Sequence, residues 1–316
     1  MTTRICVIGC GAVGGLFAAH LAQLDDVQVF AYDLASDHVD AINRSGLRLT
    51  GKADLVGRLQ ATSDPSEIPP CDFGIVATKS YATRAAIGSA AVCFPDYASV
   101  CSVQNGVGNE EIVAEYVGHV LRGTTFPAGH LVEPGVVEMD AVGDTWIGPF
   151  EEQPAAMEEV RRLAELLSRA GMPTAALEDA RGAQWTKLIF NAATNPIGAL
   201  TSLSHGRVCE LPALRSLVSE LVAEGIAVAA ALGITLESDP EELIDHAARV
   251  AYDHRASMLQ DVLARRRTEI DSLNGGIVAF GEQLGIPTPL NRAIAALVQG
   301  LESSFLTSTS ASEERS

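Results

Sequence analysis

Apolar and polar positions follow two different patterns along the first third of the chain. Continuous apolar runs bounded by Gly, Pro or Asp predict buried strands. These strands are expected at 4–9, 27–33, 73–78 and 98–103. Longer Ala-rich runs between them predict helices at 12–24 and 81–93. Strands that alternate with helices at this spacing favour a parallel sheet with right-handed crossovers.

The pattern changes between residues 119 and 148, where short β-like pieces are separated by Pro127, Pro134 and Gly143. We expect antiparallel strands there that extend the sheet. A helix at 158–171 and a short strand at 174–177 follow.

Strand signals end near residue 179, and the rest of the chain predicts helices. They are expected at 214–232, 241–263, 268–284 and 290–301, with Gly and Pro at their boundaries. We therefore expect a first domain at 1–179 and a helical domain at 180–302. The Ser-, Thr- and Glu-rich segment 303–316 predicts a disordered tail.

Charge and cysteine usage exclude several classes of protein. The 316 residues carry a net charge of −18, which repels phosphate backbones and anionic membrane surfaces. The six cysteines form no CxxC pair, which favours buried thiols over disulfides or metal ligands. The chain also shows no signal peptide and no run of about 18 apolar residues. We expect a cytoplasmic protein without a metal site, a nucleic-acid partner or a membrane partner.

Three glycines lie at and just beyond the end of the first predicted strand, within the run Gly9-Cys10-Gly11-Ala12-Val13-Gly14. Gly9 allows a tight turn, Gly11 lets backbone approach a pyrophosphate, and Gly14 lets the helix pack on the sheet. The helix N-terminus offers N–H groups to the phosphates. The run therefore predicts a dinucleotide site. The fold class is α/β, with an N-terminal Rossmann-type doubly wound sheet followed by an all-helical C-terminal domain.

Asp33 lies at the end of the second predicted strand, about 20 residues beyond the glycines. An acid there accepts hydrogen bonds from a ribose 2′-hydroxyl and repels a 2′-phosphate. No Arg or Lys lies between residues 32 and 43, which favours NAD over NADP. Arg44, Lys52 or Lys79 could still fold back to that phosphate.

Lys79 and Asn105 each follow the tip of a predicted strand. The carboxyl ends of strands line the ligand crevice of an open α/β sheet, so we expect both residues at the ligand. The alternatives are that Asn105-Gly106 is an ordinary turn and that Lys79 is solvated.

Lys187, Asn191 and Asn195 recur at steps of four in an apolar, helix-like run. Such steps place all three side chains on one stripe of an α-helix. Pro196 is expected to end the helix at the last of them. The stripe carries hydrogen-bonding groups for a small polar ligand and one transferable proton, although a solvated helix face would look similar.

Ser257 and Glu269 belong to a second polar cluster. On one straight helix they would lie about 18 Å apart and could not share a small substrate. Capping-box patterns that begin at Ser257 and at Thr268 predict a break between residues 261 and 268. We expect this break to bring Ser257 and Glu269 to one pocket.

Together these motifs resemble the ketopantoate reductase (2-dehydropantoate 2-reductase) family over residues 3–302. The matching segments are Gly9-x-Gly11-Ala-x-Gly14, Lys79, Gln104-Asn105-Gly106, Lys187-x-x-x-Asn191-x-x-x-Asn195-Pro196, Ser257-Met-Leu-Gln-Asp and Arg-Thr-Glu269-Ile-Asp. The resemblance implies a Rossmann domain, a helical domain and an active site in the cleft between them. It also implies hydride transfer from NADPH to the keto carbon of 2-dehydropantoate, which gives (R)-pantoate.

The resemblance also implies roles for individual residues. Lys187 would donate the proton, and Glu269 would bind near the nicotinamide or a substrate hydroxyl. Asn105 would touch both cofactor and substrate. The remaining substrate-binding residues would be Asn191, Asn195 and Ser257. This chemistry is reasonable, because hydride addition creates negative charge that a preorganised ammonium can stabilise, and burial lowers a lysine pKa.

Two positions depart from the family pattern. Asp33 stands where NADPH-using members commonly carry a basic residue, so the cofactor is NADP or NAD. His205 stands where we would expect another substrate-facing Asn. The main alternative is therefore an NAD-dependent D-2-hydroxyacid dehydrogenase that acts on another 2-keto acid.

Two further hypotheses remain. The chain could be a non-catalytic dinucleotide sensor, or a dehydrogenase that uses His130 or His205 as its acid. The expected partner is a small-molecule 2-keto acid, and a homodimer is left open.

Overall fold

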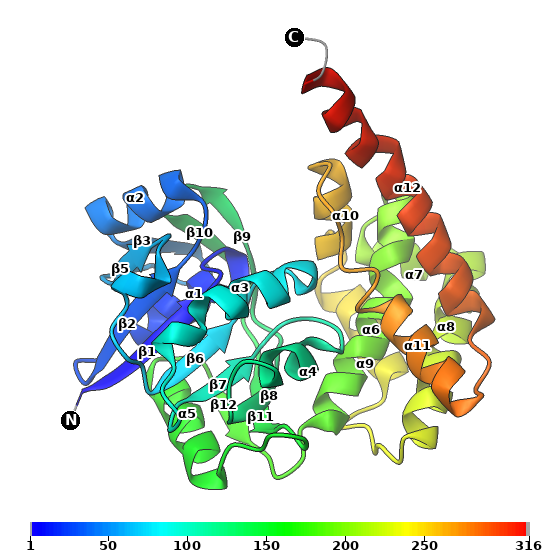
Figure 1. The fold of residues 1–316 in the computed structure, drawn as a ribbon. Coiled ribbons are helices and arrows are strands. Elements are labelled where there is room, and N and C mark those ends of the chain that lie inside the picture. Colours follow the sequence, from blue (N-terminus) through cyan, green and yellow to red (C-terminus); the bar gives the residue numbers. More distant parts are fainter. Residues whose placement is uncertain (1, 314–316) are drawn as a thin grey trace. The chain divides into compact units, whose positions relative to one another are not determined.

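The computed structural model describes the backbone of residues 2–313 and the side chains as far as residue 306. The chain divides into two compact units. The first contains Met1–Gln104 and Gly108–Ala180, and the second contains Asn105–Val107 and Arg181–Ser316. All strands of the described residues belong to the first unit, and the second is built from helices and loops (Figure 1).

An eight-stranded sheet forms the centre of the first unit, in the order β12-β11-β8-β7-β6-β1-β2-β5. Its strands are β1 (Thr3–Ile8), β2 (Val27–Tyr32), β5 (Gln60–Thr62), β6 (Phe73–Val76), β7 (Ser99–Ser102), β8 (Val120–Thr125), β11 (Thr145–Pro149) and β12 (Thr174–Ala176). The strands from β5 to β8 are all parallel, and β11 is antiparallel to β8. The order from β5 to β8 is that of a Rossmann sheet, as the sequence predicted.

Helices cover both faces of this sheet and bury two separate apolar clusters. Helices α1 (Ala12–Leu21) and α5 (Met157–Arg169) enclose one cluster, and α3 (Thr83–Ala90) and α4 (Asn109–Ala114) enclose the other. Helix α2 (Ser36–Ser45) follows β2. The alternation of strands and helices thus produces a three-layer unit.

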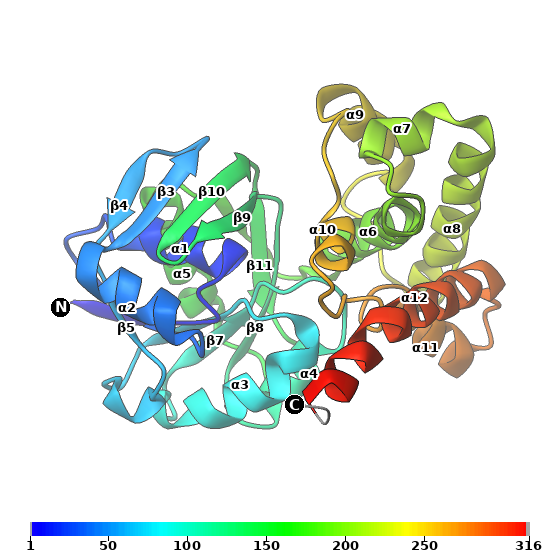
Figure 2. The ribbon, with the colours of Figure 1, turned by 90° about the horizontal axis from the view of Figure 1, so that it is seen from above.

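A second sheet of four strands lies beside α1 (Figure 2). Its order is β4-β3-β10-β9, with β3 (Leu47–Gly51), β4 (Leu55–Gly57), β9 (Ala128–Glu133) and β10 (Val136–Ala141). The expectation that 119–148 extends the main sheet was therefore wrong for β9 and β10. The reason is packing: Val137 is fully buried against α1, and a Cβ on Gly15 would lie only 2.9 Å from it.

Helix α6 (Arg181–Thr201) is the central element of the second unit. It contacts α7 (His205–Glu210), α8 (Pro212–Ala231), α9 (Pro240–Val250), α10 (Ser257–Leu263) and α12 (Pro289–Glu313). Helix α11 (Asn274–Leu284) packs on α8 and α12. These helices share one apolar core, to which α6 contributes Trp185, Leu188 and Ile189.

Helix α6 continues through Pro196, so the expectation that this proline ends the helix was wrong. A proline inside a helix lacks the N–H that would bond the carbonyl four residues earlier, here that of Ala192. The side-chain amide of Asn274 donates to the Ala192 carbonyl instead, at 2.9 Å. Asn274 is fully buried at the start of α11. A side chain of a neighbouring helix thus donates the hydrogen bond that Pro196 cannot give to the Ala192 carbonyl.

The single helix expected at 241–263 is interrupted between α9 and α10. The backbone of the intervening segment pairs with α7, since the N–H groups of His205 and Gly206 donate to the carbonyls of His254 and Tyr252. A Cβ on Gly206 would lie 2.1 Å from the Tyr252 ring. These tertiary contacts compete with helix formation and prevail over the local pattern.

The helix expected at 268–284 begins six residues late, at Asn274. The predicted capping box is absent, because the Thr268 N–H donates to the Glu302 carboxylate at 2.6 Å. Asp271, its expected partner, accepts from Arg267 and Gln299 at 3.0 and 2.8 Å. Residues 270–273 form a turn instead of a helix.

Helix α12 extends to Glu313, so it enters the segment that we expected to be a disordered tail. Glu302 and Phe305 are each 7% exposed, which shows that the helix still packs against the unit at that point. Residues 314–316 of the expected tail lie outside the described residues.

The cysteines are mostly buried thiols, as the sequence predicted. All six cysteines are free, and five of them are buried. Among residues 2–313, none of the helices combines the length and the apolarity that crossing a membrane requires.

The Asn274–Ala192 bond generates a stability prediction. Asn274→Ala should lower the free energy of unfolding by about 1–3 kcal/mol, because a buried carbonyl loses its donor. In a Pro196→Ala background the restored N–H can bond Ala192, so the same substitution should cost less. Urea unfolding of the four proteins in this double-mutant cycle measures the difference. An equal cost in both backgrounds would contradict the compensation.

Candidate active site

The loop after β1 has the geometry that its glycines predict. Gly9 has a φ of +83°, and a Cβ there would lie 2.6 Å from the Thr78 side chain. A Cβ on Gly14 would lie 1.9 Å from the Gly9 carbonyl oxygen, so α1 touches the end of β1. At Gly11, by contrast, no described atom beyond its chain neighbours lies within 4 Å of a Cβ position. Backbone at Gly11 is therefore open to a ligand, as a pyrophosphate site requires.

The first turn of α1 is also suited to an anion. Gly11 is the N-cap residue and supplies no side-chain cap to the turn that contains Ala12 and Val13. The first N–H groups of a helix lack intrahelical partners and carry partial positive charge. The loop and the turn together fit the phosphates of a dinucleotide.

Asp33 follows β2 and fixes this loop. Its carboxylate accepts the Cys10 N–H at 2.8 Å and the Ala35 N–H at 3.0 Å. Each carboxylate oxygen retains capacity for a further hydrogen bond, so Asp33 can also accept from a ribose hydroxyl. Arg44 occupies the last turn of α2, about 12 Å along the helix from Ser36. The start of α2 instead adds a second acid, Asp37.

Lys79 lies at the carboxyl edge of the main sheet, three residues beyond β6 and partly buried. Gln104 ties the loop after β6 to the loop after β7. Its side-chain amide donates to the Thr78 carbonyl at 2.9 Å and to the Thr83 hydroxyl at 2.8 Å. Because Thr78 also contacts Gly9, this network places the loop that carries Lys79 beside the glycine loop.

The segment 105–107 packs with the helical unit. The Val107 N–H donates to the Ser272 carbonyl at 3.1 Å, and Gln184 donates to the Gly106 carbonyl at 3.4 Å. Gly106 has a φ of +86°, and a Cβ there would lie 2.5 Å from the Ser272 carbonyl oxygen. The close contact requires a glycine, so Gly106 is more than an ordinary turn residue. Asn105 is thereby held beside α6.

Lys187, Asn105 and Glu269 form a continuous hydrogen-bonded chain. The Lys187 ammonium donates to the Asn105 carbonyl oxygen at 2.8 Å, and the Asn105 amide donates to the Glu269 carboxylate at 3.2 Å. Burial lowers the pKa of Lys187 to about 8, and the negative charge of Glu269 limits the fall. The group is therefore an acid that can release its proton near neutral pH.

Asn191 and Asn195 lie one and two turns beyond Lys187 on α6, and each is 7% exposed. No hydrogen bond joins the Asn191 carboxamide to another described residue. Asn195 accepts a long bond from the Thr194 hydroxyl at 3.5 Å. Both carboxamides therefore retain donors and acceptors for a polar ligand. The continuous helix keeps them on the stripe that Lys187 begins.

Ser257 is the first residue of α10 and is exposed. The capping box predicted there was wrong, because Ala256 is the N-cap residue and makes no side-chain bond. Gln260 donates to the Arg255 carbonyl at 3.0 Å instead. The predicted break is confirmed, since α10 ends at Leu263.

The start of α10 lies against α6. The Ala256 Cβ would be 3.9 Å from a Cβ on Gly198, which places Ser257 near the turn of α6 that contains Asn195. The meeting of Ser257 and Glu269 in one pocket stays a prediction.

His205 begins α7 and is 8% exposed. Its ring stacks on Phe190 with centroids 5.5 Å apart, and its Nε2 lies 3.3 Å from the Ile244 carbonyl oxygen. Burial lowers the pKa of His205. These contacts are those of a packed histidine that supports α6, rather than of a proton donor. His130, the other candidate, lies in the small sheet, with Nδ1 3.0 Å from the Asp140 carboxylate.

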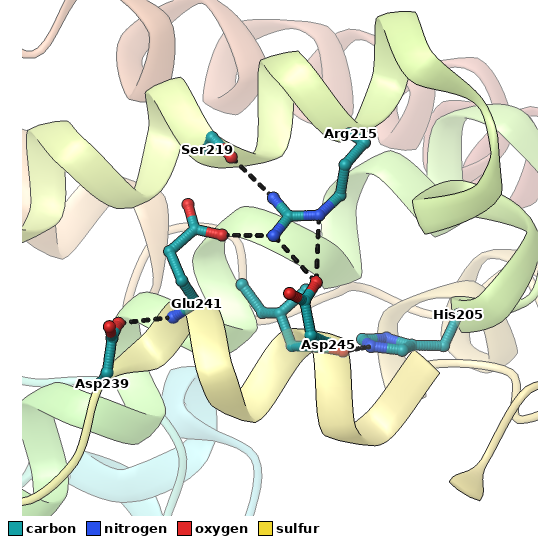
Figure 3. Close-up of polar contacts among 7 residues, drawn as sticks. His205, Arg215, Ser219, Asp239, Glu241 and Asp245 are labelled. Carbon is teal, nitrogen blue, oxygen red and sulfur yellow. Dashed lines mark hydrogen bonds and ion pairs between the residues drawn. The ribbon is translucent and has the colours of Figure 1, made fainter. Parts of the chain in front are cut away.

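Helix α9, which provides the carbonyl beside His205, is held to α8 by a polar cluster (Figure 3). Arg215 of α8 donates to Glu241 at 2.5 Å, to Asp245 at 2.9 Å and to Ser219 at 2.6 Å. The position of His205 thus depends on α8 as well as on α9.

The sequence motifs missed two residues of this arrangement, Gln104 and Gln184. Both are largely buried glutamines whose amides bond loop carbonyls. A glutamine in an apolar run is a weak signal for such a role, because the partner carbonyls come from distant segments.

Two family models together match most of the chain. The ketopantoate reductase PanE/ApbA model matches residues 5–152, and the ketopantoate reductase PanE/ApbA C-terminal model matches residues 179–302. The chain is 36% identical to the 2-dehydropantoate 2-reductase of Pyrococcus horikoshii, over 95% of this chain and 98% of that protein. It is 34% identical to that of Archaeoglobus fulgidus, with the same coverage.

Solved structures show the same fold. A PanE/ApbA family ketopantoate reductase from Ralstonia eutropha JMP134 is 32% identical, with a TM-score of 0.86 over 96% of this chain and 99% of that one. D-mandelate dehydrogenase with NADH and anilino(oxo)acetate has a TM-score of 0.87 over 96% and 99%. At 24% identity it shares the fold alone. On sequence and structure, this chain belongs to the ketopantoate reductase PanE/ApbA family.

Proposed function

We propose that this chain reduces 2-dehydropantoate to (R)-pantoate, with a nicotinamide dinucleotide as cofactor. The hydrogen-bonded chain of Lys187, Asn105 and Glu269 is the observation that carries the proposal. It supplies an ammonium of lowered pKa, in a fixed position, on the helix stripe that also carries two carboxamides. The names of relatives such as the Pyrococcus horikoshii protein support the choice of substrate.

The dinucleotide would supply the hydride to the keto carbon. Negative charge then develops on the carbonyl oxygen, and the Lys187 ammonium stabilises it and donates a proton from Nζ. Asn105 holds Nζ in place, and Glu269 keeps the group charged before transfer. Asn191, Asn195 and Ser257 would bind the carboxylate and hydroxyl groups of the substrate.

The glycine loop, the first turn of α1 and Asp33 would hold the dinucleotide, with Lys79 at the same edge of the sheet. Asp33 supports NADH as the preferred form, because its charge would repel a 2′-phosphate and no described cation lies at the start of α2. The family resemblance supports NADPH. The preference for NADH or NADPH thus depends either on the residue at position 33 or on cations elsewhere in the unit.

A second candidate function keeps the chemistry and changes the substrate. Two observations favour an NAD-dependent D-2-hydroxyacid dehydrogenase. The carboxylate of Asp33 lies at the glycine loop. His205 stands where the resemblance implies another substrate-facing Asn, and its ring is packed on Phe190. A panel of 2-keto acids, assayed in parallel with NADH and NADPH, separates the two candidates.

The central test is the initial rate of nicotinamide oxidation with 2-dehydropantoate, for the natural protein and for Lys187→Ala. We expect turnover by the natural protein and a loss of kcat of about 10²–10⁴-fold in the variant, because general acid catalysis is removed. Cofactor binding, followed by nicotinamide fluorescence, should persist. Arg249→Ala, an exposed cation in the same unit, is the control. Cofactor binding without turnover on any 2-keto acid would instead support a non-catalytic sensor.

Glu269→Gln should change the pH profile of kcat/KM. Lys187 must be protonated to act as the acid, so reduction should decline as pH rises through about 8. Glu269 raises the pKa of Lys187, and its loss should therefore move this alkaline limb to lower pH. The control is Glu282→Gln, an exposed carboxylate in the same unit. A limb that stays in place or moves to higher pH would contradict the coupling.

Asp33→Asn should shift cofactor preference toward NADPH. The amide can still accept the Cys10 N–H through its oxygen, but the charge that repels a 2′-phosphate is removed. We expect the ratio of kcat/KM for NADPH to that for NADH to rise about tenfold or more, since each 1.4 kcal/mol is a factor of ten. Asp40→Asn, an exposed acid on α2, is the control. An unchanged ratio would mean that Asp33 does not select the cofactor.

A further inference from the structure

His38 of α2 is 2% exposed and lies between two backbone groups of the first unit. The Gly135 N–H donates to its Nδ1 at 3.0 Å, and its Nε2 lies 2.9 Å from the Cys10 carbonyl oxygen. An N–H only donates and a carbonyl only accepts, so Nδ1 must be unprotonated and Nε2 must carry the hydrogen. The two bonds therefore fix a neutral imidazole in one tautomer.

One of these bonds acts on the glycine loop. Cys10 lies between Gly9 and Gly11, whose lack of side chains leaves the loop conformationally free. The Cys10 N–H is held by Asp33 at 2.8 Å, and its carbonyl is held by His38. Both peptide planes that flank Cys10 are thus fixed by side chains. The N–H groups that follow at the start of α1 depend on the orientation of these planes.

The other bond reaches the turn between β9 and β10. Gly135 has a φ of +79°, and a Cβ there would lie 3.0 Å from Ala41 of α2. Its carbonyl accepts the Arg48 N–H of β3 at 2.9 Å. The turn is therefore packed on α2 and bonded to the small sheet. His38 connects this sheet to the glycine loop.

We infer that His38 is a positioning residue for the dinucleotide, which orients the Cys10 peptide of the phosphate-binding loop and couples that loop to the Pro134–Gly135 turn. The inference rests on the proposed use of the glycine loop as the cofactor site. His38 does not touch the reacting atoms. Its effect should appear in cofactor affinity and not in the chemical step.

The same unit offers a matched control in His20, a buried histidine of α1. Its Nδ1 is bonded to the Ala170 carbonyl at 2.8 Å, and its Nε2 has no partner among the described atoms. His20 therefore shares burial and one backbone bond with His38, but its bond does not reach the glycine loop. Loss of His20 tests for a general effect of removing a buried histidine.

The experiment compares His38→Phe, His38→Gln and His20→Phe with the natural protein. In His38→Phe two buried backbone groups lose their partners, so the Kd for NADH and for NADPH should rise about tenfold. The kcat at saturating cofactor and the KM for the keto acid should stay close to those of the natural protein. His38→Gln should recover most of the affinity, because its amide offers both a donor and an acceptor. His20→Phe should leave the Kd unchanged.

Several outcomes would overturn the inference. These are an unchanged Kd in His38→Phe, an equal rise in His20→Phe, or a loss confined to kcat. If the natural protein binds neither dinucleotide, the proposed function itself fails. Should His38→Phe not fold, ¹⁵N NMR of the natural protein decides: the His38 ring must show a protonated Nε2 and an unprotonated Nδ1, and a charged ring or the opposite tautomer overturns the inference.

Discussion

The arrangement of the helical unit around its polar stripe depends on one constraint, the partly buried ammonium group of Lys187. A cation withdrawn from water must find hydrogen-bond acceptors and opposite charge, or it loses its proton. The chain meets this demand with an amide and a carboxylate from distant segments, Asn105 and Glu269. The pKa of Lys187 falls only to about 8, because Glu269 opposes the desolvation. The backbone contacts of Gly106 and Val107 with Gln184 and Ser272 are therefore part of the same arrangement, since they keep Asn105 in place.

Helix α6 can carry the stripe of polar side chains only if it stays regular through the turn that contains Pro196. The residue before a proline is usually driven out of the helical conformation, and here that residue is Asn195. The amide of Asn274 satisfies the Ala192 carbonyl and so removes one cost of a proline in mid-helix. Asn274 also donates to Asn291 of α12 at 3.0 Å. The regularity of α6 is thus a tertiary property, supplied by α11 and α12.

These dependencies explain which features could be predicted from the sequence. The glycine loop and the spacing of Lys187 and Asn191 are local signals, because their meaning depends on one strand end or one helix face. The partner of Ala192 could not be predicted, because it lies on another helix. The small sheet was missed for a related reason: β3 pairs with β10 across more than eighty residues, and short strands give weak patterns. Likewise the break before α10 comes from the backbone bonds of His205 and Gly206, and not from local propensity.

In the glycine loop, a structural role and the choice between NAD and NADP would fall on the same residue, Asp33. Asp33 would select between NAD and NADP by its charge, but its carboxylate also accepts the Cys10 N–H. A basic side chain at this position could not accept that bond and would leave the Cys10 N–H without its partner. The His38 bond to the Cys10 carbonyl would remain. Of the two peptide groups that flank Cys10, only the one that contains this carbonyl would then still be held by a side chain. A switch from NAD to NADP would therefore need a residue at position 33 that is neutral yet still a hydrogen-bond acceptor, with the cation for a 2′-phosphate supplied from another position.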